Sequence, residues 1–340
     1  MKNLIVSILF LGIVLLFQAC GKDTTEFIVT GTTTINLTDT AWEDESKLTT
    51  PIVLPIEKLQ LAKAPTQDTC TAEIGKKIVV PEDVTVDIPA NACVTKNNQI
   101  CKGKLDIEVL VLRTKGEIVT FDKPTTSGGK LLVSGGVVYI SVKQKGEDVK
   151  LASGKTLKIR VKSSAEIDGM KLFEGKSMGR FNFDWTPITG NFGAVTAVIW
   201  QDSSQSRENK GFDIVTDRFG WINCDKFHDE GNLTNKFAVT LADSFSNRNT
   251  SIYLVFKDIN SVVKLEGVSS SKQFNIPNGY KGIPIGRKIS VVSISNFDNG
   301  HTPAYSLIDI QETTVVANNT LKLKPLRLSI DEIKKKILGL

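Results

Sequence analysis

Short runs in which apolar and polar residues alternate recur along this 340-residue chain from about residue 51 onward. In Val84–Ile88, for example, the three aliphatic side chains fall on one face, and Leu105–Leu112 begins with the same alternation. Alternation with a period of two marks a β-strand with one buried face, because successive side chains of a strand point to opposite sides of the sheet. The pattern predicts an all-β chain of many short strands.

The alternating runs form two groups, which predict two β-sandwich-like domains in tandem. The first group ends with Leu157–Val161 and predicts a first sandwich over residues 51–164. The second group predicts a second sandwich over residues 228–328, with turn signals such as Pro277-Asn278-Gly279 between its strands. Its predicted strands are Phe237–Leu241, Ser251–Phe256, Val262–Leu265, Lys272–Ile276, Lys288–Ile294, Tyr305–Gln311 and Thr320–Leu323.

Between the two groups, residues 165–227 form an aromatic-rich segment that we expect to pack on the β domains. Trp185 and Trp221 lie there among Phe, Asp and Asn residues, on either side of the polar stretch Gln201–Lys210, which predicts an exposed loop. Exposed aromatic rings would form a platform for sugars, whereas buried rings would be core residues at strand ends with neighbouring Asx turns. The solvent exposure of the two Trp side chains discriminates between these interpretations.

The C-terminal residues 329–340 predict a short amphipathic helix. Ser329 and Glu332 have the spacing of a capping box, in which each side chain bonds a backbone N–H of the other residue. The apolar stripe of this helix would consist of Ile330, Ile333, Ile337 and Leu338.

The N-terminal stretch has the pattern of a signal peptide. Lys2 is followed by the uncharged run Leu4–Phe17, which ends shortly before Ala19-Cys20. This run of fourteen residues is too short for a membrane-spanning helix, which needs about 20. A small residue directly before a cysteine resembles the lipobox of bacterial lipoproteins, in which a signal peptidase cuts before that cysteine. An ordinary secretory signal and an uncleaved N-terminal anchor are the alternatives.

The lipobox resemblance implies that residues 1–19 are removed and that Cys20 carries acyl chains such as palmitate. Residues 20–50, rich in Thr, Asp and Glu, then predict a flexible tether. The pair Lys22-Asp23 resembles in part the surface-export signal of Bacteroidetes lipoproteins. We therefore expect a cell-envelope lipoprotein, anchored by Cys20 in the lipid of the outer membrane at its surface or its periplasmic face.

One stretch of the first predicted sandwich carries a second resemblance. Its residues are Gly75, Val84, Ile88-Pro89-Ala90-Asn91-Ala92, Gly103 and Leu105–Leu112, followed by Pro124–Gly136 and Val137–Val142. This stretch resembles the β-module shared by zonula occludens proteins, ankyrins and netrin receptors, and similar modules of Bacteroidetes lipoproteins. The resemblance implies a role in protein interaction and carries no catalytic residue to this chain.

Two glycine pairs in the same stretch, Gly128-Gly129 and Gly135-Gly136, border β-branched runs. A phosphate-binding loop would have to open a helix, so that its N–H groups face the anion. We therefore interpret both pairs as turns or bulges.

With Cys20 acylated, four cysteines remain, and an even number in an oxidising compartment favours disulfides. Cys93 and Cys101 lie symmetrically about Asn97, so a hairpin would place them opposite each other. We predict a Cys93–Cys101 disulfide. Cys70 and Cys224 are the leftover pair, and nothing local sets the distance between them.

The net charge and the scarcity of catalytic or metal-binding residue clusters favour a binding protein over an enzyme. The formal charge of +5 is far from the clustered basic stripe of a nucleic-acid-binding protein, so no nucleic-acid partner is expected. The segment Cys224–Asp229 contains a Cys, a His and two Asp, but no second His lies nearby to complete a tetrahedral metal site. No metal or cofactor is therefore expected. If the chain were a hydrolase, carboxylates such as Asp184, Asp225 and Glu230 would have to act as its catalytic groups.

Two functions follow from these observations. The preferred hypothesis is a structural or protein-interaction module whose partner is another envelope protein. The alternative is a glycan-binding lipoprotein that contacts a polysaccharide through Trp185, Trp221 or nearby aromatics. An enzyme acting on envelope polymers is a distant third.

Overall fold

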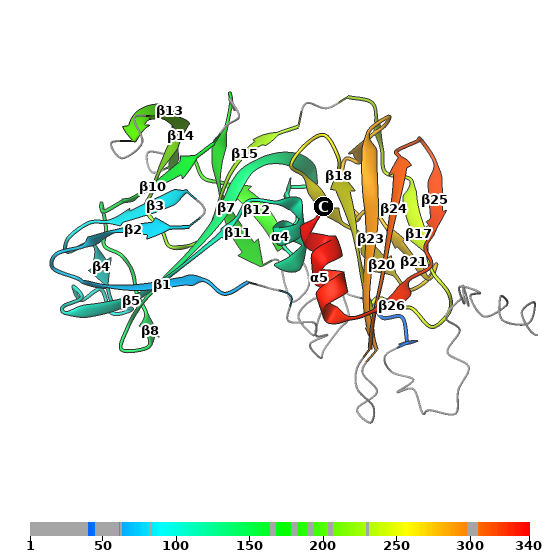
Figure 1. Ribbon diagram of the computed structural model, residues 1–340, viewed down its shortest axis with the longest axis horizontal. Coiled ribbons are helices and arrows are strands. Elements are labelled where there is room, and N and C mark those ends of the chain that lie inside the picture. Colours follow the sequence, from blue (N-terminus) through cyan, green and yellow to red (C-terminus); the bar gives the residue numbers. More distant parts are fainter. Residues whose placement is uncertain are drawn as a thin grey trace, which may run out of the picture. The chain divides into compact units, whose positions relative to one another are not determined.

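The computed structural model describes residues 40–44, 61, 63–81, 83–163, 168–177, 183–189, 193–202, 207–228, 231–297 and 305–340. Within these ranges the chain is all-β apart from two helices, as the alternating pattern predicts (Figure 1). The predicted signal peptide and Cys20 lie outside the described residues, as does most of the predicted tether. Neither of the two described helices has the length and hydrophobicity needed to cross a bilayer.

Two antiparallel sheets face each other in the first sandwich. The strands of the first sheet are, in spatial order, β1 (Thr66–Thr71), β5 (Lys104–Leu112), β7 (Lys130–Gln144), β15 (Gly220–Phe227), β11 (Lys171–Ser177) and β12 (Phe183–Pro187), while β6 (Thr126–Ser127) and β8 (Glu147–Asp148) pair with β7. The second sheet has the order β13 (Gly193–Asp202), β14 (Arg207–Thr216), β10 (Leu157–Lys162), β3 (Val84–Ile88), β2 (Lys76–Val80). A small pair, β4 (Cys93–Val94) and β9 (Lys150–Leu151), lies beside them.

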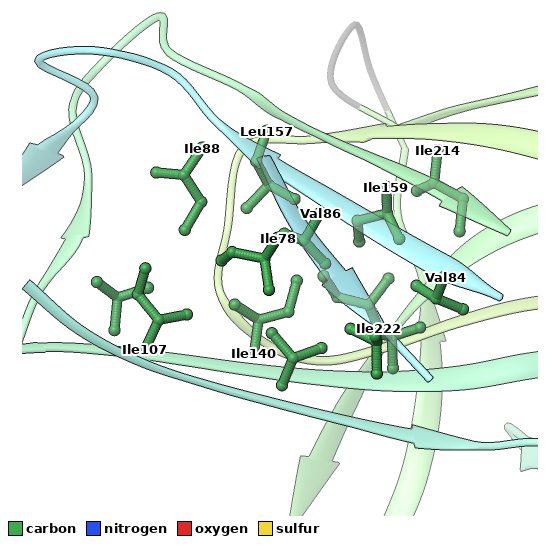
Figure 2. Close-up of a cluster of buried hydrophobic side chains, with 14 of the residues drawn as sticks. Ile78, Val84, Val86, Ile88, Ile107, Ile140, Leu157, Ile159, Ile214 and Ile222 are labelled. Carbon is green, nitrogen blue, oxygen red and sulfur yellow. The ribbon is translucent and has the colours of Figure 1, made fainter. Parts of the chain in front are cut away.

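Aliphatic side chains fill the space between these two sheets (Figure 2). Alternation decides which residues enter this core: Ile78 and Val80 of β2 are buried, whereas Val79 between them is 72% exposed. The facing sheet contributes Ile107 and Ile140. Each such side chain contributes about 1.5–3 kcal/mol when it leaves water, so the pattern visible in the sequence is also what stabilises the sandwich.

The middle segment differs from the prediction. Residues 171–227 do not pack on a finished sandwich but supply strands to both of its sheets, with Phe212 and Ile214 of β14 facing the core. The described parts of the predicted loop Gln201–Lys210 are strand rather than loop, because β13 continues to Asp202 and pairs there with Arg207, where β14 begins. Polar residues dominate the ends of both strands, which extend beyond the core, so alternation is weak there.

The second sandwich has two sheets of its own. One has the order β19 (Val262–Lys264), β18 (Thr250–Phe256), β23 (Lys288–Phe297), β24 (Tyr305–Thr314), β26 (Leu326–Leu328). The other has the order β20 (Glu266–Val268), β21 (Gln273–Asn275), β17 (Phe237–Thr240), β25 (Asn319–Lys322), in which β17 and β25 run parallel. A further pair consists of β16 (Leu233–Thr234) and β22 (Ile283–Pro284). All seven strands predicted for this region are present.

Part of the predicted tether is docked on this second sandwich. Trp42 packs against Phe274 with ring centroids 5.1 Å apart. The backbone N–H of Glu43 donates to Asn247 Oδ1 at 3.0 Å, and Asn247 Nδ2 donates to the Glu43 carbonyl at 2.7 Å. The flexible-tether prediction is therefore wrong for Thr40–Asp44, because one large aromatic side chain and two backbone hydrogen bonds hold this segment.

Two helices lie at the junction of the sandwiches. The helix α4 (Lys115–Thr120) was not predicted, and α5 (Ile330–Leu338) is the predicted C-terminal helix with its capping box formed. Of the predicted stripe, Ile333 and Ile337 are buried, whereas Ile330 and Leu338 are about half exposed. The two helices touch closely at Gly116, where a Cβ atom would lie 2.2 Å from the carbonyl oxygen of Ile337.

The two sandwiches share one apolar core. It contains Leu110 and Trp185 from the first sandwich, Tyr253 and Val292 from the second, and Ile333 from α5. Because side chains from both halves are buried in the same cluster, we describe the two sandwiches as one body.

Backbone hydrogen bonds of the glycine-containing stretch complete the junction. The N–H groups of Thr125 and Ser134 donate to the carbonyls of Val262 and Asn260, at 2.8 and 2.9 Å. The pair Gly128-Gly129 has positive φ at both positions (55° and 74°) and forms the two-residue turn between β6 and β7. Gly135-Gly136 lies at a register irregularity between β7 and β15. The interpretation of both pairs as turns or bulges is confirmed.

Candidate functional site

The strand β13 is an edge strand without the usual protection. Among the described strands it pairs with β14 only, and from Gly193 to Gln201 it contains no charged residue and no proline. Ile199 on this strand is 65% exposed. The unpaired edge of a strand presents a row of N–H and C=O groups to solvent, and proteins commonly blunt such edges with Lys, Pro or bulges.

Other edges of the first sandwich carry this protection. At the opposite edge of the same sheet, β2 begins with Lys76 and Lys77. In the facing sheet, the edge strand β12 contains Asp184 and ends at Pro187. The contrast identifies β13 as the edge best suited to pair with a further strand.

Side-chain ion pairs and an aromatic ring order the outer face of the sheet beside β13. Arg160 donates from Nε and Nη2 to the two carboxylate oxygens of Asp213, at 2.7 and 2.8 Å, and Lys158 lies 2.6 Å from the same carboxylate. Burial opposes ionisation of Asp213, but the bonds from Arg160 and Lys158 outweigh it and lower its pKa. The Arg160 guanidinium also stacks 5.0 Å from the Trp200 ring, which fixes an aromatic side chain of β13.

A polar cleft of about 760 Å³ lies over the second sandwich, at the sheet of β20, β21, β17 and β25. Backbone register places Glu266, Asn275, Ala238 and Thr320 in one row across these four strands. Ala238 has the smallest side chain of the row, and all four residues of the row line the cleft. The rest of the lining is Asn235, Lys236, Phe237, Val268, Ile276, Pro277, Asn278, Gly279, Tyr280, Asn318 and Asn319.

One wall of this cleft reaches the glycine turn of the first sandwich. Tyr280 Oη lies 2.8 Å from Thr126 Oγ1, and burial raises the pKa of Tyr280 to about 12. The Lys281 N–H donates to the Gly129 carbonyl at 2.9 Å, and a Cβ atom on Gly129 would lie 2.5 Å from the Gly279 carbonyl oxygen. The glycine is needed there because the two turns touch.

The two predicted glycan-contact residues, Trp185 and Trp221, differ in their exposure to solvent. Trp185 is fully buried, and its indole N–H donates to the Pro124 carbonyl at 3.0 Å, so it leaves no face for a sugar. Trp221 is half buried, 4.8 Å from the Tyr139 ring, and the Lys123 ammonium lies 5.0 Å from its centroid. The exposed coplanar pair that a sugar platform requires is not formed by these rings, which instead pack in the shared core and at its border.

The four described cysteines are free thiols, so neither predicted disulfide is present. Val94 pairs with Ile100, which confirms the predicted hairpin register and places Cys93 opposite Cys101. The Cys101 N–H donates to the Cys93 carbonyl at 3.0 Å, so the two residues face each other across the hairpin, but both remain free thiols.

The leftover pair is excluded by the order of strands. Cys70 lies on β1 and Cys224 on β15, with β5 and β7 between them in the sheet. Three strand spacings separate the two residues by at least about 14 Å, more than twice the Cα separation of a disulfide. Burial raises the pKa of both thiols, and burial followed by the neighbouring Cys101 and Cys70 raises the pKa of Cys93 to about 12.

The predicted carboxylates are not brought together. Asp184 is opposite Lys176 and Asp225 is opposite Lys171 on β11, five residues or about 17 Å along the strand. Asp225 is fully buried beside Asn223, whose Nδ2 donates to Asp225 Oδ2 at 2.5 Å, and burial raises its pKa well above the usual range. Glu230 lies outside the described residues. In the described part of the chain, no group of three or more His, Cys, Asp or Glu side chains could hold a metal ion.

No family model, curated protein or solved structure matches this chain. The edge strand β13 and the polar cleft are therefore the features of this chain that bear on its function. Sequence reasoning missed both features, because strand order and the meeting of distant loops decide them.

Proposed function

We propose that this chain is a cell-envelope lipoprotein that binds another envelope protein by adding a strand of that partner to β13. The single observation that carries this proposal is the uncharged edge from Gly193 to Gln201, paired on one side. In strand addition, main-chain hydrogen bonds give affinity, and pockets for alternate side chains give specificity. Ile199 and Trp200 would supply apolar and aromatic contacts to the added strand.

Other features support a binding role for the first sandwich. Two of the residues that carry the resemblance to an interaction module lie against each other: Gly75 has φ of 71°, and a Cβ atom there would lie 2.3 Å from the Ile88 carbonyl oxygen. The shared core joins this sandwich to the second one. A partner bound at β13 would therefore be held by the whole body rather than by a loosely linked domain.

The membrane anchor remains part of the proposal. Acyl chains on Cys20 would keep the body in the lipid of the outer membrane, at the surface or on the periplasmic side. Holding the module near a membrane raises its effective concentration toward partners anchored there, so contacts of modest affinity become sufficient. The partner is then expected to be another envelope protein, with no nucleic acid, metal or cofactor involved.

Site-specific crosslinking in intact cells tests the proposal. A photoreactive residue at position 199 should capture one envelope protein, with the crosslink in an extended segment of that protein. Val79 provides a matched control position, since it is 72% exposed against 65% for Ile199 and lies on the opposite edge strand of the same sheet.

Substitutions add a quantitative test. Once the captured partner is identified, Ile199→Lys should weaken its binding to the mature chain at least tenfold, whereas Val79→Lys should leave the affinity within twofold. Because both side chains are exposed, each substitution should change the free energy of unfolding by no more than about 0.5 kcal/mol. Equal capture from positions 199 and 79, or capture of a second copy of this chain alone, would contradict the proposal.

A further inference from the structure

The polar cleft of the second sandwich is a separate feature, built on elements that β13 does not touch. We propose that it binds a neutral sugar residue of a glycan, with Ala238 as its floor. This inference is independent of strand addition, because the cleft residues belong to β17, β20, β21, β25 and their loops.

Amide side chains dominate the polar lining. Five of its fifteen residues are asparagines: Asn235, Asn275, Asn278, Asn318 and Asn319. An amide offers a carbonyl acceptor and two N–H donors, while each sugar hydroxyl both donates and accepts. A lining of amides therefore matches a ligand covered with hydroxyl groups better than it matches one that only accepts or only donates.

The charges in the cleft favour a neutral ligand. Lys236 and Glu266 are the two charged residues of the lining, so their formal charges cancel. A phosphate or sulfate ligand would be better served by arginine, which forms paired hydrogen bonds with such groups. A divalent cation would need several carboxylates, and the lining supplies the single carboxylate of Glu266.

The shape of the cleft also fits a sugar ring. Its volume of about 760 Å³ lies within the range of roughly 300–1,000 Å³ for small-molecule sites. Pro277 and Tyr280 form an apolar part of the wall, which can face the C–H side of a sugar. The Tyr280 hydroxyl is engaged by Thr126, so the wall is fixed before a ligand arrives.

The row of residues in register suggests a variant that fills the cleft. Ala238 and Thr240 point to the same side of β17, and Thr240 is not part of the lining. Ala238→Tyr would place a ring over the floor of the cleft. Thr240→Tyr would place the same side chain two residues further along β17, outside the lining. The two variants are matched in chemistry, strand and face, and differ in their relation to the cleft.

The test is a titration of the intact mature chain, followed by nuclear magnetic resonance, with cellobiose, maltose and N-acetylglucosamine at up to 10 mM each. We expect at least one sugar to bind, with affinity unchanged by 0.5 M NaCl. Ala238→Tyr should weaken binding more than tenfold, and Thr240→Tyr by less than twofold. Asn275→Ala should also weaken binding more than tenfold, because a sugar hydroxyl in the cleft loses its partner.

Three outcomes would overturn the inference. The first is that none of the three sugars binds to the folded wild-type chain. The second is that binding survives Ala238→Tyr in a folded variant. The third is that binding is lost in 0.5 M NaCl, which would indicate a charged ligand. A failure here leaves capture at position 199 unaffected, so the two proposals are tested separately.

Discussion

Asp225 is a carboxyl group buried in the first sandwich, close to the junction with the second. Burial raises its pKa, and the hydrogen bonds from Ser134, the Gly135 N–H and Asn223 oppose this shift without cancelling it. The folded state therefore binds the Asp225 proton more tightly than the unfolded state, whose pKa for this group is about 3.9. The contribution of Asp225 to stability is then most favourable below about pH 4 and is lost as the pH rises toward the folded pKa.

The substitution Asp225→Asn tests the direction of this pH dependence of stability. The amide keeps the size of the side chain and a donor, but it cannot ionise. The stability of Asp225→Asn relative to wild type should therefore increase as the pH rises from 4 to 8, as measured by urea unfolding at several pH values. A difference that stays constant, or that decreases with rising pH, would show that Asp225 is not held protonated in the folded chain.

Contact between α4 and α5 depends on a glycine. A Cβ atom on Gly116 would meet the Ile337 carbonyl at 2.2 Å, so Gly116→Ala must push the helices apart where Ile333 and Ile337 enter the shared core. Overpacking of this kind costs about 1–3 kcal/mol of unfolding free energy. Gly231→Ala is the control, because nothing lies within 4 Å of a Cβ there and it should change stability by no more than about 0.5 kcal/mol. Equal effects of the two substitutions in urea unfolding would refute this account.

At the scale of elements, the sequence predicts those strands and helix ends that interactions between neighbouring residues determine. Val84–Ile88 and the C-terminal capping box were predicted correctly, because alternation and helix capping act within a few residues. The helix α4 was missed, although Thr114 and Glu117 form a capping box that is visible in the sequence. The edge position of β13 and the cleft follow from strand order and from loops far apart in the chain, such as those at Asn235 and Asn318, and no local pattern reports these.

For the whole molecule, the proposed lipid anchor on Cys20 would set its place in the cell. Each buried CH₂ of an acyl chain contributes about 0.8 kcal/mol, so several chains on Cys20 would hold the body at a membrane. Wild-type mature protein should partition into detergent, and Cys20→Ser should remain in the aqueous phase. A wild-type protein found in the aqueous phase with an unmodified N-terminus would contradict the anchor.

Strand addition at β13 would bond the unpaired edge of this strand to the backbone of the partner. The most direct measurement is hydrogen exchange of the backbone amides of Gly193–Asp202 in the mature chain, with and without the partner captured at position 199. Strand addition predicts that those amides of β13 that are not bonded to β14 become protected by at least tenfold when the partner binds, while the amides of β2 do not change. Unchanged exchange in β13 at saturating partner, or equal protection of β2, would contradict it.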